Sequence, residues 1–251
     1  MAAAAESQKK STGREYYEAL LIALIFVNFA RIFVFQAFKI PSGSMEDNLK
    51  IGDHIIVNKF IYGPNGKGAA AELMPLRGIE RGDIVVFRYP RQPEIDFVKR
   101  VIGLPGERIS IENKRVFVNG KRIDEPYVVY DDAHVYPRSE FLPEGHRFRD
   151  QMESFTVPAG QYFVMGDNRD HSSDSRYWGT VPRTMIKGRA FMVYWSFDWE
   201  PASPEGTAGD RMRELGNVVL RFFTHTRWRR TFFIVDSKYH FTPGVTSYGT
   251  E

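Results

Sequence analysis

One long apolar run stands near the N-terminus, and the rest of the chain has a different pattern. Residues 19–38 read ALLIALIFVNFARIFVFQAF, in which Asn28, Arg31 and Gln36 are the strongly polar positions. About 20 mostly apolar residues are enough for a helix to cross a bilayer. We therefore predict a single transmembrane helix over residues 19–38 that stays in place as a signal anchor.

The residues before this run predict its orientation. Lys9, Lys10 and Arg14 precede it, and basic residues favour the cytoplasmic side of a membrane. Residues 1–18 are then a cytoplasmic tail, and residues 39–251 lie on the other side. Two alternatives stay open, a buried core helix and a cleaved signal peptide, although no A-x-A-like cleavage site follows the run.

Beyond the anchor, short runs of β-forming residues alternate with turn residues, and little of the sequence has helical periodicity. Asn119-Gly120 lies between two such runs and predicts a type I′ hairpin. We predict a mostly β domain with an irregular inserted region at about 107–160, of which 127–153 is charged and aperiodic. The predicted strands fall within 33–40, 53–63, 83–90, 96–111 (two strands), 115–123, 161–168 and 188–198.

Composition limits the classes of function. The 251 residues suit one globular unit with an anchor, and the net charge of +3 does not require a nucleic-acid partner. The basic and aromatic stretch 210–235 could lie on an anionic membrane surface or could cap the β domain. The chain has no cysteine, which excludes disulfides, thiol nucleophiles and cysteine metal sites.

Candidate chemistry begins directly after the apolar run, at Ser42-Gly43-Ser44. A serine hydroxyl becomes a good nucleophile only when a positioned base removes its proton. Of the six histidines, His171 alone lies in a dense polar cluster, where a surface position is the commoner explanation. Lysine is the other candidate base, because strand alternation places Lys99 on a nearly apolar face with Ile95, Phe97 and Val101. Burial on such a face lowers the pKa of an amine, whereas exposure or pairing with a carboxylate would make Lys99 an ordinary structural residue.

Four sequence blocks together carry a family resemblance. Following the apolar run in this order, they resemble the conserved boxes of bacterial type I signal peptidase, also called leader peptidase. The resemblance is specific in these blocks and extends more weakly over about 33–197. The blocks are IPSGSM (40–45), GDHIIVNKFIYG (52–63), RGDIVVFRYP with DFVKRVIGLPGE (81–107) and GDNRDHSSDSRYWGTVP (166–182).

The resemblance implies a signal-peptidase-like β-barrel catalytic domain that cleaves exported preproteins after small residues, without metal or cofactor. By the same resemblance, Ser44 is the nucleophile and Lys99 the general base. The Ser42 hydroxyl and the Ser44 backbone N–H form the oxyanion hole, and Ser172 holds the Lys99 amine. A charge network supports the last block, formed by Asp167, Arg169, Asp174 and Arg176.

The resemblance also implies a place and partners. It implies a single-pass protein of the bacterial inner membrane with its catalytic domain on the periplasmic side. The expected partners are preprotein signal peptides and membrane phospholipid, with no nucleic acid. Contact with the protein-export machinery is compatible with this location.

The chain departs from the family pattern at three points. The family often has x-Pro-Thr-Leu after the methionine, but Glu46-Asp47-Asn48-Leu49 stands here, which leaves the shape of the turn after Ser44 open. His171 stands where asparagine is common, and Phe97 stands where tyrosine is common. Neither change affects the proposed nucleophile or base.

Substrate recognition and two other functions complete the predictions. Phe38, Ile40 and Leu49 flank Ser44 and could line shallow pockets for an extended peptide, with core packing as the alternative. A LexA-like self-cleaving repressor could use the same pair of residues, but the predicted anchor argues against it. An inactive module that only holds signal peptides is disfavoured because both Ser44 and Lys99 are present.

Overall fold

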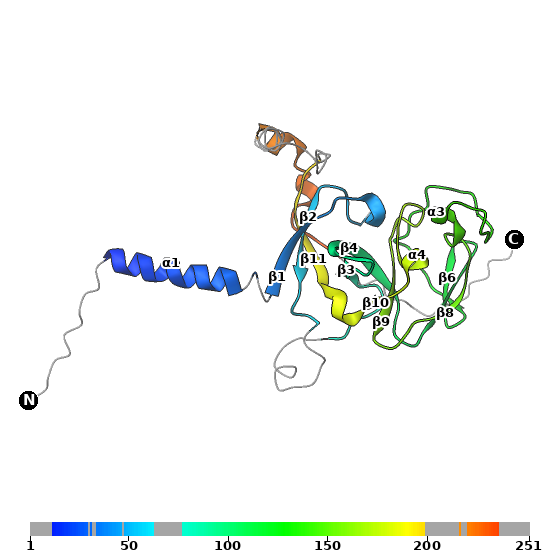
Figure 1. The fold of residues 1–251 in the computed structure, drawn as a ribbon. Helices are drawn as coiled ribbons and strands as arrows, with labels where there is room; N and C mark the ends of the chain where they lie inside the picture. The colour runs from blue at the N-terminus through cyan, green and yellow to red at the C-terminus, as the bar shows by residue number, and fades with distance from the viewer. Residues whose placement is uncertain are drawn as a thin grey trace, which may run out of the picture.

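Two antiparallel sheets form the body of the protein (Figure 1). The computed structural model describes residues 12–29, 31, 34–46, 48–62, 77–198, 216 and 220–235. In the larger sheet the strands follow the order β1-β2-β11-β3-β4-β9-β10, and β12 pairs with β11; the smaller sheet has the order β7-β6-β5-β8. The strands are β1 (Phe35–Lys39), β2 (Asp53–Asn58), β3 (Ile84–Tyr89), β4 (Gln92–Gly103), β5 (Arg108–Glu112), β6 (Arg115–Val118), β7 (Lys121–Arg122), β8 (Met152–Thr156), β9 (Gln161–Met165), β10 (Val181–Pro182), β11 (Ile186–Ser196) and β12 (Phe233–Ile234).

Among the described residues, α1 (Thr12–Phe29) is the longest helix. The other helices with both ends described are the α-helices α3 (Glu144–Arg147) and α4 (Ser175–Trp178) and the 3-10 helices η2 (Gly43–Met45), η3 (Arg183–Met185) and η4 (Trp228–Arg230). Residues 216 and 220–225 are helical as well. The predicted mostly β class is therefore confirmed.

The large sheet is curved but not closed, which corrects the prediction of a barrel. Its strand path runs from β1 to β10, and these end strands do not pair with each other in the described part of the chain. Register shifts interrupt the pairing of β11 with both β2 and β3. Such irregularities bend and twist a strand. They account for curvature without joining the two edges.

The predicted helix over 19–38 is wrong in its C-terminal part. The helix α1 begins earlier, at Thr12, and ends at Phe29, while Phe35–Lys39 is the strand β1. This strand pairs antiparallel with β2 along one edge, and its side chains alternate between exposed and half-buried. The sequence alternates as a strand at 33–40, and over Phe35–Lys39 the chain forms that strand instead of continuing the helix.

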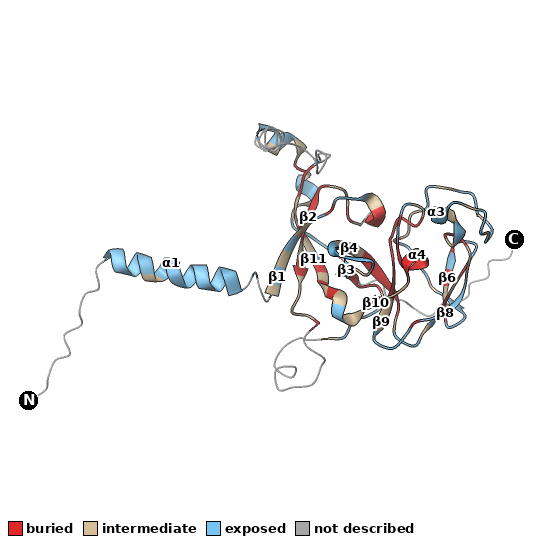
Figure 2. Ribbon diagram, viewed as in Figure 1, coloured by how far each residue is buried: buried red, intermediate tan, exposed pale blue. Residues whose placement is uncertain are grey.

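The helix α1 stands away from both sheets (Figure 1), and none of its residues is buried (Figure 2). No helix in the described residues, α1 included, is long and apolar enough to span a membrane.

The region 107–160 is more regular than predicted. It contains the whole small sheet, β5 to β8, and its irregular part between β7 and β8 holds one short helix, α3. The hairpin prediction is confirmed, because β6 and β7 pair antiparallel around Asn119 and Gly120, whose φ angles are 51° and 77°. Positive φ at both central residues is the mark of a type I′ turn. Pairing of β5 with the distant β8 could not be foreseen from local pattern.

Within the described part of the chain, three apolar clusters fill the spaces around the sheets. One lies under the segment that carries Ser44 and joins strands β2, β3 and β11; it includes Met45 and Leu49, and it also includes Val235 near the described C-terminal end. A second lies between β3, β4 and β9 and includes Phe87 and Trp178. The third lies under the small sheet. The first two clusters place apolar side chains on both faces of the large sheet.

We expect Gly188→Ala to destabilise the large sheet. An added Cβ would lie 2.4 Å from the carbonyl oxygen of Asn58 on the neighbouring strand β2. Overlap with backbone cannot be relieved by a rotamer change, so the free energy of unfolding should fall by about 2 kcal/mol or more. The corresponding loss of melting temperature is about 5 °C, measurable by thermal unfolding. Gly145→Ala is the control, because a Cβ there meets nothing within 4 Å; equal melting temperatures for the two variants would contradict the prediction.

Candidate active site

Ser44 lies in a tight turn between two strands of the large sheet. It is the middle residue of η2, between β1 and β2, and is 8% exposed. Its carbonyl oxygen accepts a hydrogen bond from the Asn168 N–H at 3.2 Å. On the other side, the Leu49 N–H donates to the Met45 carbonyl at 2.8 Å, and both of these side chains are buried in the core. The turn that carries Ser44 is thus held from both directions.

Lys99 reaches the same place from the middle of β4. Its Nζ lies 2.6 Å from the Ser44 Oγ, and the side chain is 4% exposed. The Nζ stands 5.4 Å from the centre of the Phe97 ring; Val101 belongs to the second apolar cluster, and Phe97 is half-buried against it. Lys99 forms no ion pair with a carboxylate in the described part of the chain. Of the apolar face predicted from strand alternation, Phe97 and Val101 accompany the buried amine, whereas Ile95 is exposed.

Burial changes the acidity of the amine. Desolvation lowers the pKa of Lys99 from 10.5 to about 8, because the charged ammonium loses its hydration. The carboxylates of Asp174 and Asp167 act in the opposite direction, and the Arg176 guanidinium adds to the lowering. A substantial neutral fraction near pH 8 gives Lys99 the protonation state that a general base needs.

Ser172 lies beside Ser44 because residue 166 is glycine. A Cβ at Gly166 would lie 2.3 Å from the Ser172 Oγ and 2.5 Å from the Ser44 carbonyl oxygen. Ser172 is 6% exposed, and its hydroxyl has no hydrogen bond of ordinary geometry among the described residues. It lies close enough to Asp174 for its side chain to contribute to the lowered pKa of that carboxyl group. The predicted contact with Lys99 is not made in this structure.

Ser42, the other predicted oxyanion residue, precedes η2. Its backbone is extended, with φ −136° and ψ 155°, and its side chain makes no capping hydrogen bond. It is exposed, whereas Ser44 is buried. The two serines therefore stand in different environments although only one residue separates them.

A buried ion pair joins the strand of Lys99 to the loop after β9. Arg100 and Asp167 are both fully buried, and the guanidinium donates to the two carboxylate oxygens at 2.8 and 2.7 Å. The Asn48 side-chain amide also donates to Asp167, at 2.7 Å. Sequence reasoning identified Asp167 but not Arg100 or Asn48. The position of Arg100 next to Lys99 could have drawn attention to it. Strand alternation, however, places the Arg100 side chain on the face opposite to Lys99, so the pattern alone did not connect it with the site.

Two further ion pairs hold the same loop. Arg176 donates to Asp174 at 2.8 and 2.9 Å, and Arg169 donates to Glu125 at 3.1 and 2.5 Å. Burial by itself would raise the pKa of the Asp174 carboxyl, but Arg176 and the Gly166 N–H outweigh it and hold that pKa below its usual value. All four of the predicted network residues are buried: Asp167, Arg169, Asp174 and Arg176. Glu125, which pairs with Arg169, was not predicted.

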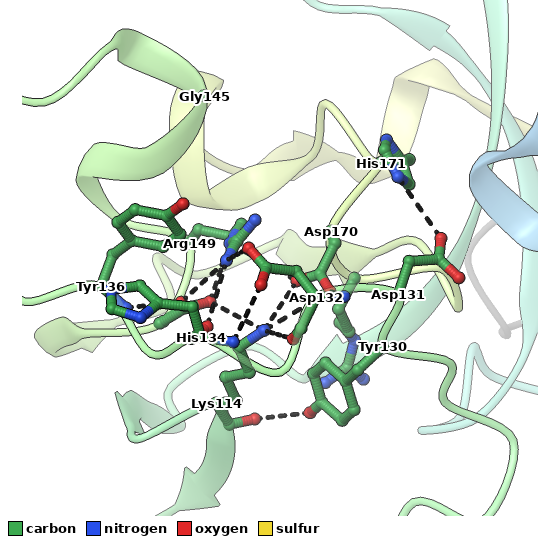
Figure 3. Close-up of polar contacts among 12 residues, drawn as sticks. Lys114, Tyr130, Asp131, Asp132, His134, Tyr136, Gly145, Arg149, Asp170 and His171 are labelled. Carbon is green, nitrogen blue, oxygen red and sulfur yellow. Dashed lines mark hydrogen bonds and ion pairs between the residues drawn. The ribbon is translucent and has the colours of Figure 1, made fainter.

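A second charge cluster connects this loop to the small sheet (Figure 3). Lys114 and Arg149 approach Asp170 at 3.1 and 3.4 Å, and Arg149 also donates to Asp132 at 2.9 Å. His171 turns away from these groups toward Asp131, 3.4 Å away, with a side chain that is 68% exposed. The exposed position of His171 agrees with its exclusion as a base. No group of three or more His, Cys, Asp or Glu side chains among the described residues could hold a metal ion.

The three candidate pocket residues divide between core and surface. Ile40 and Leu49 are 3% and 0% exposed and belong to the first apolar cluster, which corresponds to the core-packing alternative. Phe38 is half-buried on β1, with the Lys187 Nζ 5.6 Å from its ring centre. Phe38 also packs against the first apolar cluster, but it alone of the three keeps part of its side chain exposed.

Comparison with known proteins decides the family. The sequence model of the family described as "Signal peptidase, peptidase S26" matches residues 13–195, more than half of the chain. The chain belongs to the peptidase S26 family of signal peptidases. It is therefore a hydrolase of the serine protease type that acts on the signal peptides of preproteins, and the family resemblance is confirmed.

Individual relatives agree with this membership. The chain is 38% identical to the signal peptidase I of Pseudomonas aeruginosa over 208 residues, which cover 74% of this chain and 72% of the relative. It is 37% identical to the signal peptidase I of Bacillus caldolyticus, covering 76% of this chain and 94% of that one. A crystal structure of a signal peptidase I from Enterococcus faecalis matches with 32% identity over 45% of this chain and 97% of that chain, with a TM-score of 0.35. That TM-score is too low to support an argument about the fold.

The lowered pKa of Lys99 predicts a pH-dependent change in stability for Lys99→Met. Between pH 8 and 10.5 the unfolded chain binds a proton at this position more readily than the folded chain, so native stability rises with pH across this window. Removing the amine should therefore stabilise the fold at pH 6 by about 3 kcal/mol, with the gain shrinking above pH 8. Denaturant unfolding at pH 6 and pH 10 measures both values; the same difference at both would show that the buried amine is not the cause.

Proposed function

We propose that the chain is a membrane-anchored serine endopeptidase that removes N-terminal signal peptides with a Ser44–Lys99 dyad. The observation that carries the proposal is the 2.6 Å separation of the Lys99 Nζ and the Ser44 Oγ in an apolar, buried setting. A nucleophile within hydrogen-bond reach of a base with a pKa near the working pH is the arrangement that acyl transfer requires.

In the proposed reaction, the neutral Lys99 amine takes the Ser44 proton as the Oγ attacks the carbonyl carbon of the scissile peptide. The resulting ammonium then gives its proton to the leaving amine, and an acyl-serine ester remains. Lys99, neutral again, removes a proton from the water that attacks this ester. Hydrolysis releases the signal peptide with a free carboxylate and restores the Ser44 hydroxyl.

Negative charge on the tetrahedral intermediate needs hydrogen-bond donors. We assign this role to the Ser44 backbone N–H and the Ser42 hydroxyl. The exposed, uncapped side chain of Ser42 supports the assignment, because no hydrogen bond within η2 competes for it. Removal of one such donor typically costs about 3 kcal/mol of transition-state stabilisation.

Ser172 is assigned to orienting the Lys99 amine. Its support is its buried position against Ser44 across Gly166. A small rotation of the Ser172 side chain toward the Lys99 amine costs little free energy.

The anchor part of the proposal concerns α1 and the residues around it. Apolar side chains of α1 are largely exposed, with Leu20 69%, Ile22 66% and Phe26 67% exposed. An apolar surface of this size requires a partner, and membrane phospholipid fits an N-terminal helix preceded by basic residues. We propose a bacterial inner-membrane location with the N-terminus cytoplasmic and the catalytic domain periplasmic, where the export machinery would deliver preproteins.

Substrate choice follows from the same geometry. Ser44 lies shortly after β1, and β1 follows α1, so a peptide held at the membrane surface would meet the nucleophile directly. Signal peptides carry small residues at alternate positions before the cleavage site. We propose cleavage after such A-x-A-like sequences, with Phe38 forming part of the wall that the extended peptide meets.

Cleavage of a preprotein tests the function. The purified full-length chain in detergent should cleave a preprotein after an A-x-A site, and Ser44→Ala and Lys99→Met should each reduce kcat/KM by at least about 10³-fold, because each removes one half of the proton-transfer pair. Gel analysis with mass spectrometry of the products identifies the bond that is cut.

Two variants serve as matched controls for this assay. Ser154→Ala and Lys121→Met change exposed residues of the small sheet and should leave cleavage unchanged. Full activity of Ser44→Ala or of Lys99→Met would refute the dyad.

The pH dependence of kcat tests the base. Because the neutral amine is the active form and the pKa of Lys99 is about 8, kcat should rise with pH through about 8 and then level off. Single-turnover rates between pH 6 and 10 give the profile. A rise centred near 6.5, the ordinary pKa of histidine, would point to a different base.

A further inference from the structure

The C-terminal segment 226–235 lies outside the family match, which ends at residue 195, yet it contacts the loop that follows Ser44. The Arg230 guanidinium donates to the Asn48 carbonyl at 2.8 Å and to the Asp53 carboxylate at 2.6 and 3.2 Å. Asp53 is fully buried, and Arg230 is mostly so, with 18% of its side chain exposed. One side chain thus joins the beginning and the end of the loop 48–53.

The segment is firmly attached to the body of the protein. The strand β12 pairs with β11 through Phe233 and Ile234, and Val235 is 2% exposed within the same apolar cluster as Met45 and Leu49. Upstream, the Arg227 guanidinium donates to the Ile51 carbonyl at 2.8 Å. The contacts of Arg230 with the loop therefore come from a fixed platform.

The loop 48–53 connects Arg230 to residues that neighbour Ser44 and Lys99. Asn48, whose carbonyl accepts from Arg230, donates through its side chain to Asp167 at 2.7 Å. Asp167 pairs with Arg100, the residue next to Lys99. Leu49 bonds back to Met45, the residue next to Ser44. The loop is therefore tied to the neighbours of both dyad residues.

We propose that Arg230 is a positioning residue, which fixes the loop 48–53 and through it the alignment of Ser44 with Lys99. The segment 226–235 is then part of the catalytic unit. The kinetic consequence rests on the proposed function, whereas the structural consequence does not. A displacement of about 1 Å in a reacting group can cost about 10²-fold in rate, so loss of this contact should act on turnover.

Hydrogen exchange of the full-length chain in detergent tests the structural consequence without requiring activity. In Arg230→Ala, amides of the loop 48–53 should exchange at least about tenfold faster, because the contact that holds them is lost, while amides of β4 should keep their protection. Arg229→Ala is the matched control, since Arg229 is the neighbouring, exposed arginine of the same 3-10 helix.

If Arg230→Ala also loosens β4, Arg230→Gln, which keeps a donor for the Asn48 carbonyl, is measured in the same way. For the proposal to hold, faster hydrogen exchange in Arg230→Gln must be confined to the amides of the loop 48–53. Unchanged loop exchange in Arg230→Ala, or faster exchange throughout the sheet in both variants, would overturn the proposal.

Kinetics separates positioning from substrate binding. Arg230→Ala should lower kcat by about tenfold or more with KM changed less than about twofold, and Asp53→Asn, which removes the carboxylate partner, should lower kcat in the same way. Arg229→Ala should match the native chain. A native chain that cleaves no preprotein would refute the proposed function and leave the exchange result to decide on Arg230, whereas native kcat in Arg230→Ala would overturn the positioning role.

Discussion

Keeping a lysine amine out of water beside a serine hydroxyl is the constraint on which the rest of this structure depends. Lys99 loses hydration in a space lined by aromatic and aliphatic side chains of the large sheet, and its pKa falls to about 8 for that reason. In a serine–histidine system the base has a suitable pKa without burial, but a lysine must obtain it from its surroundings. The mostly β architecture supplies those surroundings, since a central strand such as β4 is covered on both faces.

The charges near this amine must also be balanced. Asp167 and Asp174 would each favour the ammonium, and each is paired with an arginine, Arg100 and Arg176 respectively. Pairing a buried carboxylate with a guanidinium reduces its field at Lys99 while satisfying its hydrogen-bonding capacity. Buried ion pairs contribute little net stability, because desolvation offsets attraction. Their contribution here is better described as fixing one geometry for the loop that carries Gly166, Asn168 and Ser172.

Local sequence pattern predicted the features that depend on neighbouring residues, but not the contacts between residues far apart in the sequence. Alternation in β4 placed Lys99 on an apolar face, and Asn119-Gly120 predicted its hairpin, because both depend on neighbouring residues. The predicted end of the first helix was wrong because residues 33–38 are apolar enough for a membrane helix and also alternate as a strand. Pairing with β2 favours the strand. Arg100, Asn48 and Glu125 were missed because their roles depend on partners 44 to 119 positions away.

The turn after Ser44 shows how a departure from the family pattern can be accommodated. A proline in this turn would restrict its backbone directly, by fixing φ. This chain has Glu46-Asp47-Asn48 instead, and the described part of the turn is restricted by contacts from elsewhere. The Asn48 side-chain amide donates to Asp167, and the Asn48 carbonyl accepts a hydrogen bond from Arg230. Restriction by distant contacts requires that those contacts be rigid themselves. The buried Arg100–Asp167 pair and the docked segment 226–235 meet this requirement, so a local loss of covalent constraint is offset by tertiary structure, part of which lies beyond the family match.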